Sequence, residues 1–158
     1  MAMIIQIPPH QYPWELLLVA DPSRPLVEEY LNNSLVFGCL EEGEVRGVVV
    51  LAPLSEFSWE IKNIAVSPNY QGRGLGKTLL RAALDLCKDR SAQEVWIGTG
   101  NSSIQQLGLY QRMGFRMVDI VKDFFSQHYA EGIVENGIRC RDMVRLVVKF
   151  QVEDTQRE

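Results

Sequence analysis

The chain has 158 residues and a net charge of −4, with 46% apolar and 23% charged residues. This composition excludes long disordered stretches, and the negative charge argues against general nucleic-acid binding, which needs a basic face to neutralise phosphates. The length predicts a single domain at residues 1–150, followed by a polar tail at residues 151–158.

The N-terminal segment and the cysteines bear on the cellular location. Residues 1–7 are mostly apolar, but they are short, have no basic segment before them and run into two prolines. We therefore expect neither a signal peptide nor a membrane anchor, and a cytoplasmic protein. The three cysteines, Cys39, Cys87 and Cys140, are widely spaced without a Cys-x-x-Cys pair, so we expect reduced, packed thiols.

The first part of the chain predicts four strands and two short helices before a glycine-rich turn. A polar connection that contains a glycine, residues 41–44, is expected to join two of the strands as a hairpin. In chain order the elements are strand 3–7, helix 14–20, helix 25–31, strand 35–40, strand 45–51 and strand 59–66.

A long amphipathic helix is predicted over about residues 73–89. A strand precedes it and a β-like run at residues 94–99 follows it, so the three segments predict a right-handed unit of two parallel strands and a crossover helix. The helix should therefore lie on a sheet. Its expected apolar face consists of Leu75, Leu79, Ala82, Ala83 and Leu86.

The last third of the chain predicts one more helix and two more strands. The helix covers residues 103–113 and ends at Gly114, and the strands cover residues 115–125 and 143–150. Between these strands, residues 126–141 show no clear period. A connection of this length is often functional.

The turn from Gln71 to Gly76 reads QGRGLG and has the character of a phosphate-binding turn. Glycine at alternate positions lets backbone N–H groups converge, and the following helix adds the positive end of its dipole. A P-loop would need a glycine where Gln71 stands, and a dinucleotide fingerprint from Gly72 would need one where Lys77 stands. By itself the turn fits either an anion site or a tight turn without a ligand.

Two patterns in the right order identify a family. The turn matches Gln-x-x-Gly-x-Gly between a strand and a helix, and residues 101–115 match Asn-(x)8-Tyr-x-x-x-Gly-Phe. On these motifs the chain resembles the GNAT superfamily of acyl-CoA-dependent N-acyltransferases, over roughly residues 45–125. The resemblance implies an α/β (α+β) fold with a mixed, mostly antiparallel, splayed sheet of six to seven strands and about four helices.

The resemblance also implies that acetyl-CoA is the co-substrate and lies between the strand before the turn and the strand after its helix. The backbone of residues 64–66 would bind the pantetheine amides like an added strand, and the turn would bind the pyrophosphate. Asn101 would contact the pantetheine, and Arg112 a phosphate. The assigned cofactor-binding residues are Ile64, Ala65, Val66, Gln71, Gly72, Arg73, Gly74, Leu75, Gly76, Lys77, Thr78, Asn101 and Arg112.

Acetyl transfer to an amine needs a neutral nucleophile, because an alkylammonium with a pKa of about 10.4 has no lone pair at neutral pH. Glu60, eleven residues before Gln71, is the candidate base, since several related transferases have a basic glutamate at this place. The alternatives are that Glu60 is simply solvated or that it pairs with Lys62, two residues further along the strand.

The leaving thiolate needs a hydrogen bond or a proton, and the resemblance gives this role to Tyr110. The alternative is that Tyr110 is a core aromatic residue. A backbone N–H of residues 64–66 is expected to bind the oxyanion. No Ser-His-Asp or Cys-His arrangement is visible, which favours direct transfer, and the two isolated histidines predict no metal site.

The acceptor is predicted from charge alone. Residues 73–90 contain five basic and two acidic side chains, a net of +3, whereas residues 9–45 contain seven acidic side chains and one arginine, a net of −6. The basic end suits CoA phosphates, and the acidic end suits an amine or is a solvated face. We expect a small-molecule amine, such as a polyamine, an amino acid or an aminoglycoside.

Two other functions remain open at this stage. One is a protein N-acetyltransferase, and the other is an acyl-CoA-binding sensor without turnover. Specificity is expected to reside in residues 14–31 and 126–141. Candidate aromatic residues for an acceptor pocket are Trp14, Tyr30, Phe125 and Tyr129. A homodimer through the last strand is possible in this family, and neither a nucleic-acid partner nor a membrane partner is expected.

Overall fold

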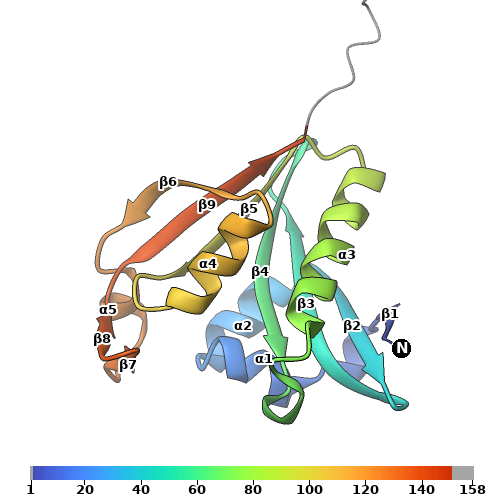
Figure 1. The fold of residues 1–158 in the computed structure, drawn as a ribbon, viewed down its shortest axis with the longest axis horizontal. Helices are drawn as coiled ribbons and strands as arrows, with labels where there is room; N and C mark the ends of the chain where they lie inside the picture. Colours follow the sequence, from blue (N-terminus) through green and yellow to red (C-terminus); the bar gives the residue numbers. More distant parts are fainter. Residues whose placement is uncertain (1, 151–158) are drawn as a thin grey trace, which may run out of the picture.

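The computed structural model describes residues 2–150, and the predicted tail at residues 151–158 lies outside them. One seven-stranded sheet organises the molecule, with strand order β1-β2-β3-β4-β5-β9-β6 (Figure 1). Its strands are β1 (Met3–Gln6), β2 (Leu35–Glu41), β3 (Glu44–Pro53), β4 (Ser58–Val66), β5 (Glu94–Gly100), β6 (Arg116–Val121) and β9 (Met143–Lys149).

Helices cover both faces of this sheet. The helices are α1 (Trp14–Ala20), α2 (Arg24–Leu31), α3 (Leu75–Asp89), α4 (Ile104–Arg112) and α5 (Phe124–His128). Figure 1 shows α1 and α2 behind the sheet and α3 and α4 in front of it. No helix in residues 2–150 is both long and apolar enough to span a membrane.

The pairing of the strands confirms the predicted fold class. Strands β4 and β5 are parallel, and the other neighbours in the sheet are antiparallel. The unit of β4, α3 and β5 is the crossover that the sequence predicted. Strand β9 lies between β5 and β6, so both of its edges are paired, and β6 is the edge strand on this side.

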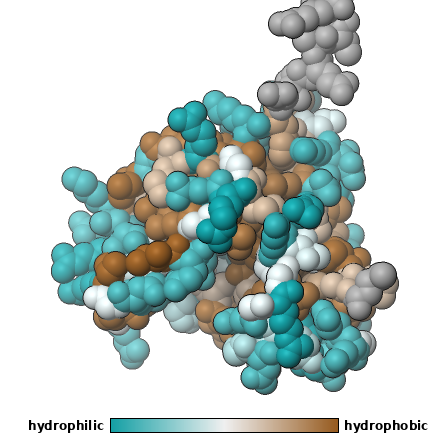
Figure 2. Space-filling view, in the orientation of Figure 1, coloured by the Kyte–Doolittle hydropathy of each residue, from teal (hydrophilic) through white to brown (hydrophobic). Residues whose placement is uncertain are grey.

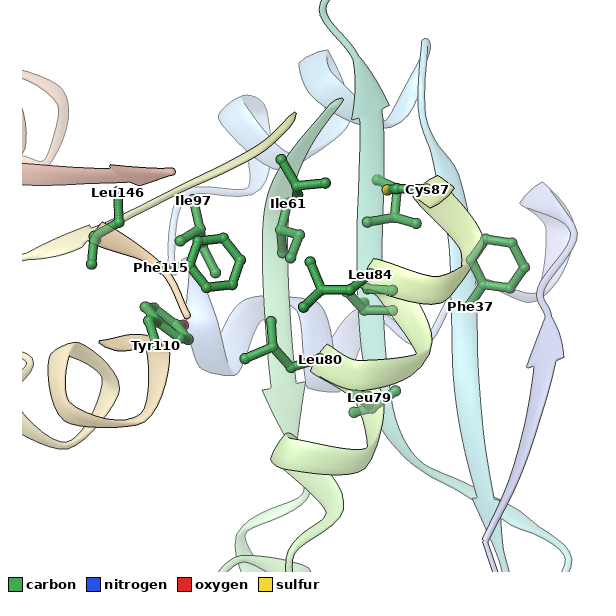
Figure 3. Close-up of a cluster of buried hydrophobic side chains, with 14 of the residues drawn as sticks. Phe37, Ile61, Leu79, Leu80, Leu84, Cys87, Ile97, Tyr110, Phe115 and Leu146 are labelled. Atoms are coloured by element: carbon green, nitrogen blue, oxygen red, sulfur yellow. The ribbon is translucent and has the colours of Figure 1, made fainter. Parts of the chain in front are cut away.

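Two hydrophobic cores lie on the two faces of the sheet. Because side chains alternate along a strand, Val49 and Leu51 of β3 pack toward α3, whereas Val48 and Val50 pack toward α1 and α2. The larger core joins α3 to the sheet and extends to Tyr110, as Figure 3 shows. Each layer of helices is therefore held by its own core.

Helix α3 begins at Leu75, two residues later than predicted, because Gly74 has the left-handed backbone of a cap. Its buried face is also wider than predicted, since it packs on β2, β3 and β4 and also lies beside Ile61, Ile97 and Phe115 in the core (Figure 3). Ala82 and Leu86 are only half-buried. The buried residues are Leu75, Leu79, Leu80, Ala83, Leu84 and Cys87.

The prediction of a strand over residues 115–125 was wrong at its end. Strand β6 ends at Val121, and Phe124 and Phe125 begin helix α5. The strand stops because Asp123 adopts a left-handed backbone with φ of 59°, and its N–H donates to the Asp142 carboxylate at 2.8 Å. A hydrogen bond to a side chain 19 positions further along therefore replaces the next bond of the sheet.

The connection at residues 126–141 is more ordered than predicted. After α5 it forms a second, two-stranded sheet from β7 (Ile133–Glu135) and β8 (Ile138–Cys140). The two strands are joined by Asn136 and Gly137, with φ values of 55° and 73°. Asn-Gly is the preferred pair for a turn with two left-handed residues, so the sequence did contain this signal.

The central feature of the sheet is the divergence of β4 and β5. Their parallel pairing covers residues 58–61 and 94–97 only. Lys62 is an extra residue in β4, because Leu51 of β3 pairs with Ile61 and Val50 pairs with Asn63. Beyond this bulge β4 stays with β3 and β5 stays with β9, and Figure 1 shows the two strands separating.

Replacing Leu79 by alanine tests whether this core holds α3. Leu79 is fully buried, so the shorter side chain leaves a cavity, and we expect the free energy of unfolding to fall by about 2–5 kcal/mol in urea. The matched control is Leu54→Ala, at a leucine that is 50% exposed, where a change within about 0.5 kcal/mol is expected. Equal losses in the two variants would contradict this account of the core.

Candidate active site

The free edge of β4 forms the first part of the site. Residues 64–66 pair with Val49, Val48 and Gly47 of β3, but the pairing with β5 has already ended at Ile61. The edge that faces β5 therefore has no strand partner among the described residues. An extended ligand with amide groups can bind such an edge as an added strand does.

The glycine turn forms the second part. Gly72 and Gly74 have φ values of 79° and 83°, in the left-handed region that favours glycine. The first helical hydrogen bond runs from the Thr78 N–H to the Gly74 carbonyl, at 3.0 Å. The backbone N–H groups of residues 72–77 have no acceptor within the described part of the chain. Together with the helix dipole, they make an anion site.

Side chains around the turn hold it in shape and add positive charge. Gln71 donates from Nε2 to the Val66 carbonyl at 3.1 Å, which ties the turn to the end of β4. The guanidinium carbons of Arg46 and Arg73 lie 4.5 and 4.7 Å from the centroid of the Tyr70 ring. Arg46 also pairs with the Glu44 carboxylate at 2.6 Å, so Arg73, within the turn itself, is the arginine that adds charge for a phosphate.

Tyr110 lies on α4 and is 4% exposed. Its ring contacts Phe115, with centroids 6.1 Å apart, and no described residue forms a hydrogen bond with its hydroxyl. Figure 3 shows the side chain on the side of α4 that faces β4 and α3. Burial raises the pKa of Tyr110 above its ordinary value, so the hydroxyl stays protonated and can donate. Tyr110 is thus a core residue with a free donor.

Glu60 lies on β4 just before the bulge, in parallel register with Trp96 of β5. Its carboxylate is 2.7 Å from the Lys62 ammonium, so the ion pair given as an alternative above is present. The two side chains are 21% and 35% exposed, and solvent screens the pair. Glu60 therefore lies where β4 and β5 separate, with a cation beside it.

Asn101 and Arg112 lie at the two ends of the segment around α4. Asn101 donates from Nδ2 to the Arg139 carbonyl at 3.1 Å, and its Oδ1 accepts from the N–H groups of Arg141 and Asp142 at 2.8 and 3.0 Å. It therefore fixes the segment that leads into β9. The Arg112 guanidinium lies back over Gly108 of the same helix. Their contacts with CoA stay predictions.

A polar cluster on the α1 and α2 side of β4 was only partly foreseen. The Asp21 carboxylate accepts from the Tyr129 hydroxyl at 2.6 Å, from the Tyr30 hydroxyl at 3.5 Å and from the Ser23 N–H at 3.1 Å. Asn63 of β4 donates from Nδ2 to the Tyr30 oxygen at 2.9 Å. The cluster joins the two segments in which specificity was expected.

The aromatic residues proposed for an acceptor pocket divide into two places. Tyr129 packs on Phe125, with ring centroids 5.5 Å apart, and shares Asp21 with Tyr30. Trp14 instead lines a separate hollow with Glu28 and Glu29 among its other lining residues. Asn63 and Asp21 were missed, although a polar residue within the apolar strand at residues 59–66 was a signal for Asn63.

No group of three or more His, Cys, Asp or Glu side chains within residues 2–150 is placed to hold a metal ion. The three cysteines are free and buried.

Comparison with known proteins decides the family. The model of the acetyltransferase (GNAT) family matches residues 2–115. The chain belongs to the GNAT family. A curated relative from Bacillus subtilis (strain 168), the uncharacterized N-acetyltransferase YvbK, is 49% identical over 133 residues, which cover 84% of this chain and 86% of the relative.

Two solved structures have the same fold as this GNAT protein. One is an IAA acetyltransferase from Bacillus cereus ATCC 14579, with a TM-score of 0.93, 45% identity and coverage of 95% of this chain and 100% of that one. The other is a GNAT family acetyltransferase from Elizabethkingia anophelis with acetyl-CoA bound, with a TM-score of 0.92, 41% identity and coverage of 94% and 98%.

Asn101→Ala tests whether this side chain holds the entry to β9 of the GNAT sheet. The variant loses three hydrogen bonds to the segment at residues 139–142, so we expect the free energy of unfolding to fall by about 1–3 kcal/mol in urea. Asn33→Ala is the control, at an exposed asparagine, and should change it by less than about 0.5 kcal/mol. Equal effects would contradict the assigned contacts.

Proposed function

We propose that this GNAT protein is an acetyl-CoA-dependent N-acetyltransferase that transfers the acetyl group directly to an amine of a small molecule. The observation that carries the proposal is the combination of a free β4 edge with a turn whose N–H groups have no protein acceptor. The bound acetyl-CoA in the structure from Elizabethkingia anophelis supports the choice of co-substrate.

The residues present fit the parts of acetyl-CoA. The N–H groups of residues 72–77 suit the pyrophosphate, because they have no acceptor in the described residues and no side chain stands at the left-handed Gly72 and Gly74. The free edge at residues 64–66 suits the amides of the pantetheine. Arg73 and Lys77 are exposed at the turn and add positive charge beside the phosphates. Figure 2 shows apolar surface between hydrophilic side chains on this face.

Acetyl-CoA supplies a thioester whose carbon is open to attack by a neutral amine. A C–N bond forms and the C–S bond breaks, while the amine loses a proton and the sulfur leaves as a thiolate. Within the site, the free N–H groups of the β4 edge are placed to bind the oxygen that gains negative charge. Because Tyr110 stays protonated, its hydroxyl donates a hydrogen bond to the leaving sulfur rather than giving up its proton.

Glu60 is the proposed acceptor of the amine proton, directly or through water. It lies at the point where β4 and β5 separate and keeps solvent access. Lys62 holds the carboxylate in place through the 2.7 Å ion pair. A proton taken by Glu60 can therefore pass on to water.

Release of free thiol from acetyl-CoA, measured with a panel of amines, tests this function. The panel holds diamines, amino acids, aminoglycosides and a peptide with a free N-terminal alanine. We expect release with a small-molecule amine and none with the peptide. Release with the peptide alone would point to a protein substrate, and CoA binding without release for every amine would favour a sensor.

The same experiment needs a control for the binding site. Gly74→Glu should weaken CoA binding at least about tenfold by calorimetry, because a side chain at φ of 83° strains the turn and a carboxylate repels phosphate. Gly137→Glu is the matched control, since Gly137 is also left-handed with open space around it but lies in the β7–β8 hairpin. Equal losses of affinity would contradict the assignment of the turn.

Tyr110→Phe tests the hydrogen bond to the leaving sulfur. We expect kcat to fall by about tenfold. This is a smaller loss than the roughly 10²–10³-fold that follows removal of an oxyanion donor, because a thiolate leaves fairly well without help. The affinity for CoA should stay unchanged. A loss of CoA affinity with unchanged kcat would mean that Tyr110 acts only in packing.

A further inference from the structure

The Asp21 carboxylate is a half-buried anion that has hydrogen-bond donors but no cation. Two tyrosines and one backbone N–H donate to it. No lysine or arginine within the described residues lies within 4.0 Å of it, and the neighbouring Arg24 pairs with Glu28 instead. A carboxylate that gives up solvent without a cationic partner is costly, so a cation from a ligand is favoured there.

The carboxylate has an unused acceptor position for such a ligand. Its Oδ1 accepts from Tyr129 and Ser23, whereas Oδ2 accepts a single bond of 3.5 Å from Tyr30. A carboxylate has about four acceptor positions, so Oδ2 keeps one free. Burial raises the pKa of Tyr30 and Tyr129, and the charge of Asp21 raises it further, so both hydroxyls stay protonated and can donate hydrogen bonds. Aromatic rings beside an anion suit an alkylammonium.

Asn63 provides a second, independent observation. This residue of β4 is 4% exposed, and its Oδ1 is buried without a partner. Its Nδ2 uses both hydrogens, for the Leu17 carbonyl and the Tyr30 oxygen, each at 2.9 Å. An unpaired buried acceptor is costly, which indicates that a donor from a ligand completes it.

The position of Asn63 relative to the proposed co-substrate is defined by the chain. The pyrophosphate turn follows β4, so the pantetheine would run from the turn past Val66 toward Ile64. The acetyl end then lies near the bulge at Lys62, where β4 and β5 separate. Asn63 directly precedes Ile64 in β4, so its backbone lies at this end of the strand, and its side chain is on the α1 and α2 side, where it bonds Leu17 and Tyr30.

We propose that Asp21 and Asn63 form a subsite for a short aliphatic diamine, a proposal that rests on the transferase function above. Asp21, framed by Tyr30 and Tyr129, binds the ammonium that does not react. The Asn63 Oδ1 accepts a hydrogen bond from the amine that attacks. The Tyr30 hydroxyl contacts both residues, because it accepts from Asn63 Nδ2 at 2.9 Å and donates to Asp21 Oδ2 at 3.5 Å, so the two residues are neighbours and a short diamine suits them better than a long one.

Electrostatics decides which amine binds to which group. A carboxylate stabilises the charged ammonium, which has no lone pair, so an amine at Asp21 is protected from reaction. A neutral amide oxygen accepts a hydrogen bond from a neutral amine and does not favour its protonated form over the neutral one. Asp21 is thus suited to anchor the substrate, and Asn63 is suited to orient its nucleophile.

Calorimetry of 1,3-diaminopropane and n-propylamine, each titrated into the protein saturated with CoA, tests the subsite. The two probes have the same carbon chain and differ by one amino group. We expect the diamine to bind at least about tenfold more tightly to the wild-type protein, and Asp21→Asn to remove the difference. Glu15→Gln is the control, because Glu15 is an exposed acid on α1 and its loss changes the net charge equally.

The outcomes separate this proposal from the function on which it rests. Equal affinity of the two probes for the wild type, or a preference that persists in Asp21→Asn, would overturn the subsite while CoA binding stays intact. If CoA does not bind the wild type at all, the transferase function fails as well. Tyr129→Phe replaces Asp21→Asn if the latter unfolds, and it should weaken the diamine selectively, since it removes the 2.6 Å bond that positions Asp21.

Discussion

The loss of pairing between β4 and β5 is the constraint on which the other features of this molecule depend. One extra residue, Lys62, forms a bulge in β4 directly after Ile61, where the ladder with β5 ends, and a bulge bends the strand that contains it. The strands then follow different neighbours, and half of β4 keeps an unpaired edge. In the proposed function, acetyl-CoA takes the place of the missing strand.

The other elements gain their roles from this divergence. Helix α3 starts where β4 ends, so its free N–H groups lie at the outer end of the unpaired edge, and its core residues fix it there. Helix α4 brings Tyr110 to the same opening from the other side. The polar cluster of Asp21, Tyr30, Asn63 and Tyr129 lies on the opposite face of β4, behind the inner end of the edge.

The sequence predicted those features that depend on local pattern or on a family motif. The unit of two parallel strands with a crossover helix follows from apolar periodicity, and the glycine turn follows from glycine at set positions. Residues 115–125 show the limit, because apolar residues continue past Asp123, whereas the left-handed backbone of Asp123 and its contact with Asp142 end the strand. The β7–β8 hairpin was missed even though Asn136 and Gly137 are a standard local signal.

The candidate site was predictable in its cofactor half but not in its acceptor half. The ion pair of Glu60 and Lys62 follows from their spacing in one strand. The contact of Tyr129 with Asp21 joins residues 108 positions apart, and neither residue lies in a motif. Such long-range contacts depend on how α2 and α5 pack against the sheet, which no local pattern contains.

Hydrogen–deuterium exchange with and without CoA tests the central claim most directly, because it reports on the backbone groups to which the claim assigns the ligand. The account predicts slower exchange at the amides of residues 64–66 and 72–77 when CoA is added, with little change in β1, β2 and β6. Protection confined to other segments, or no protection under saturating CoA, would contradict it.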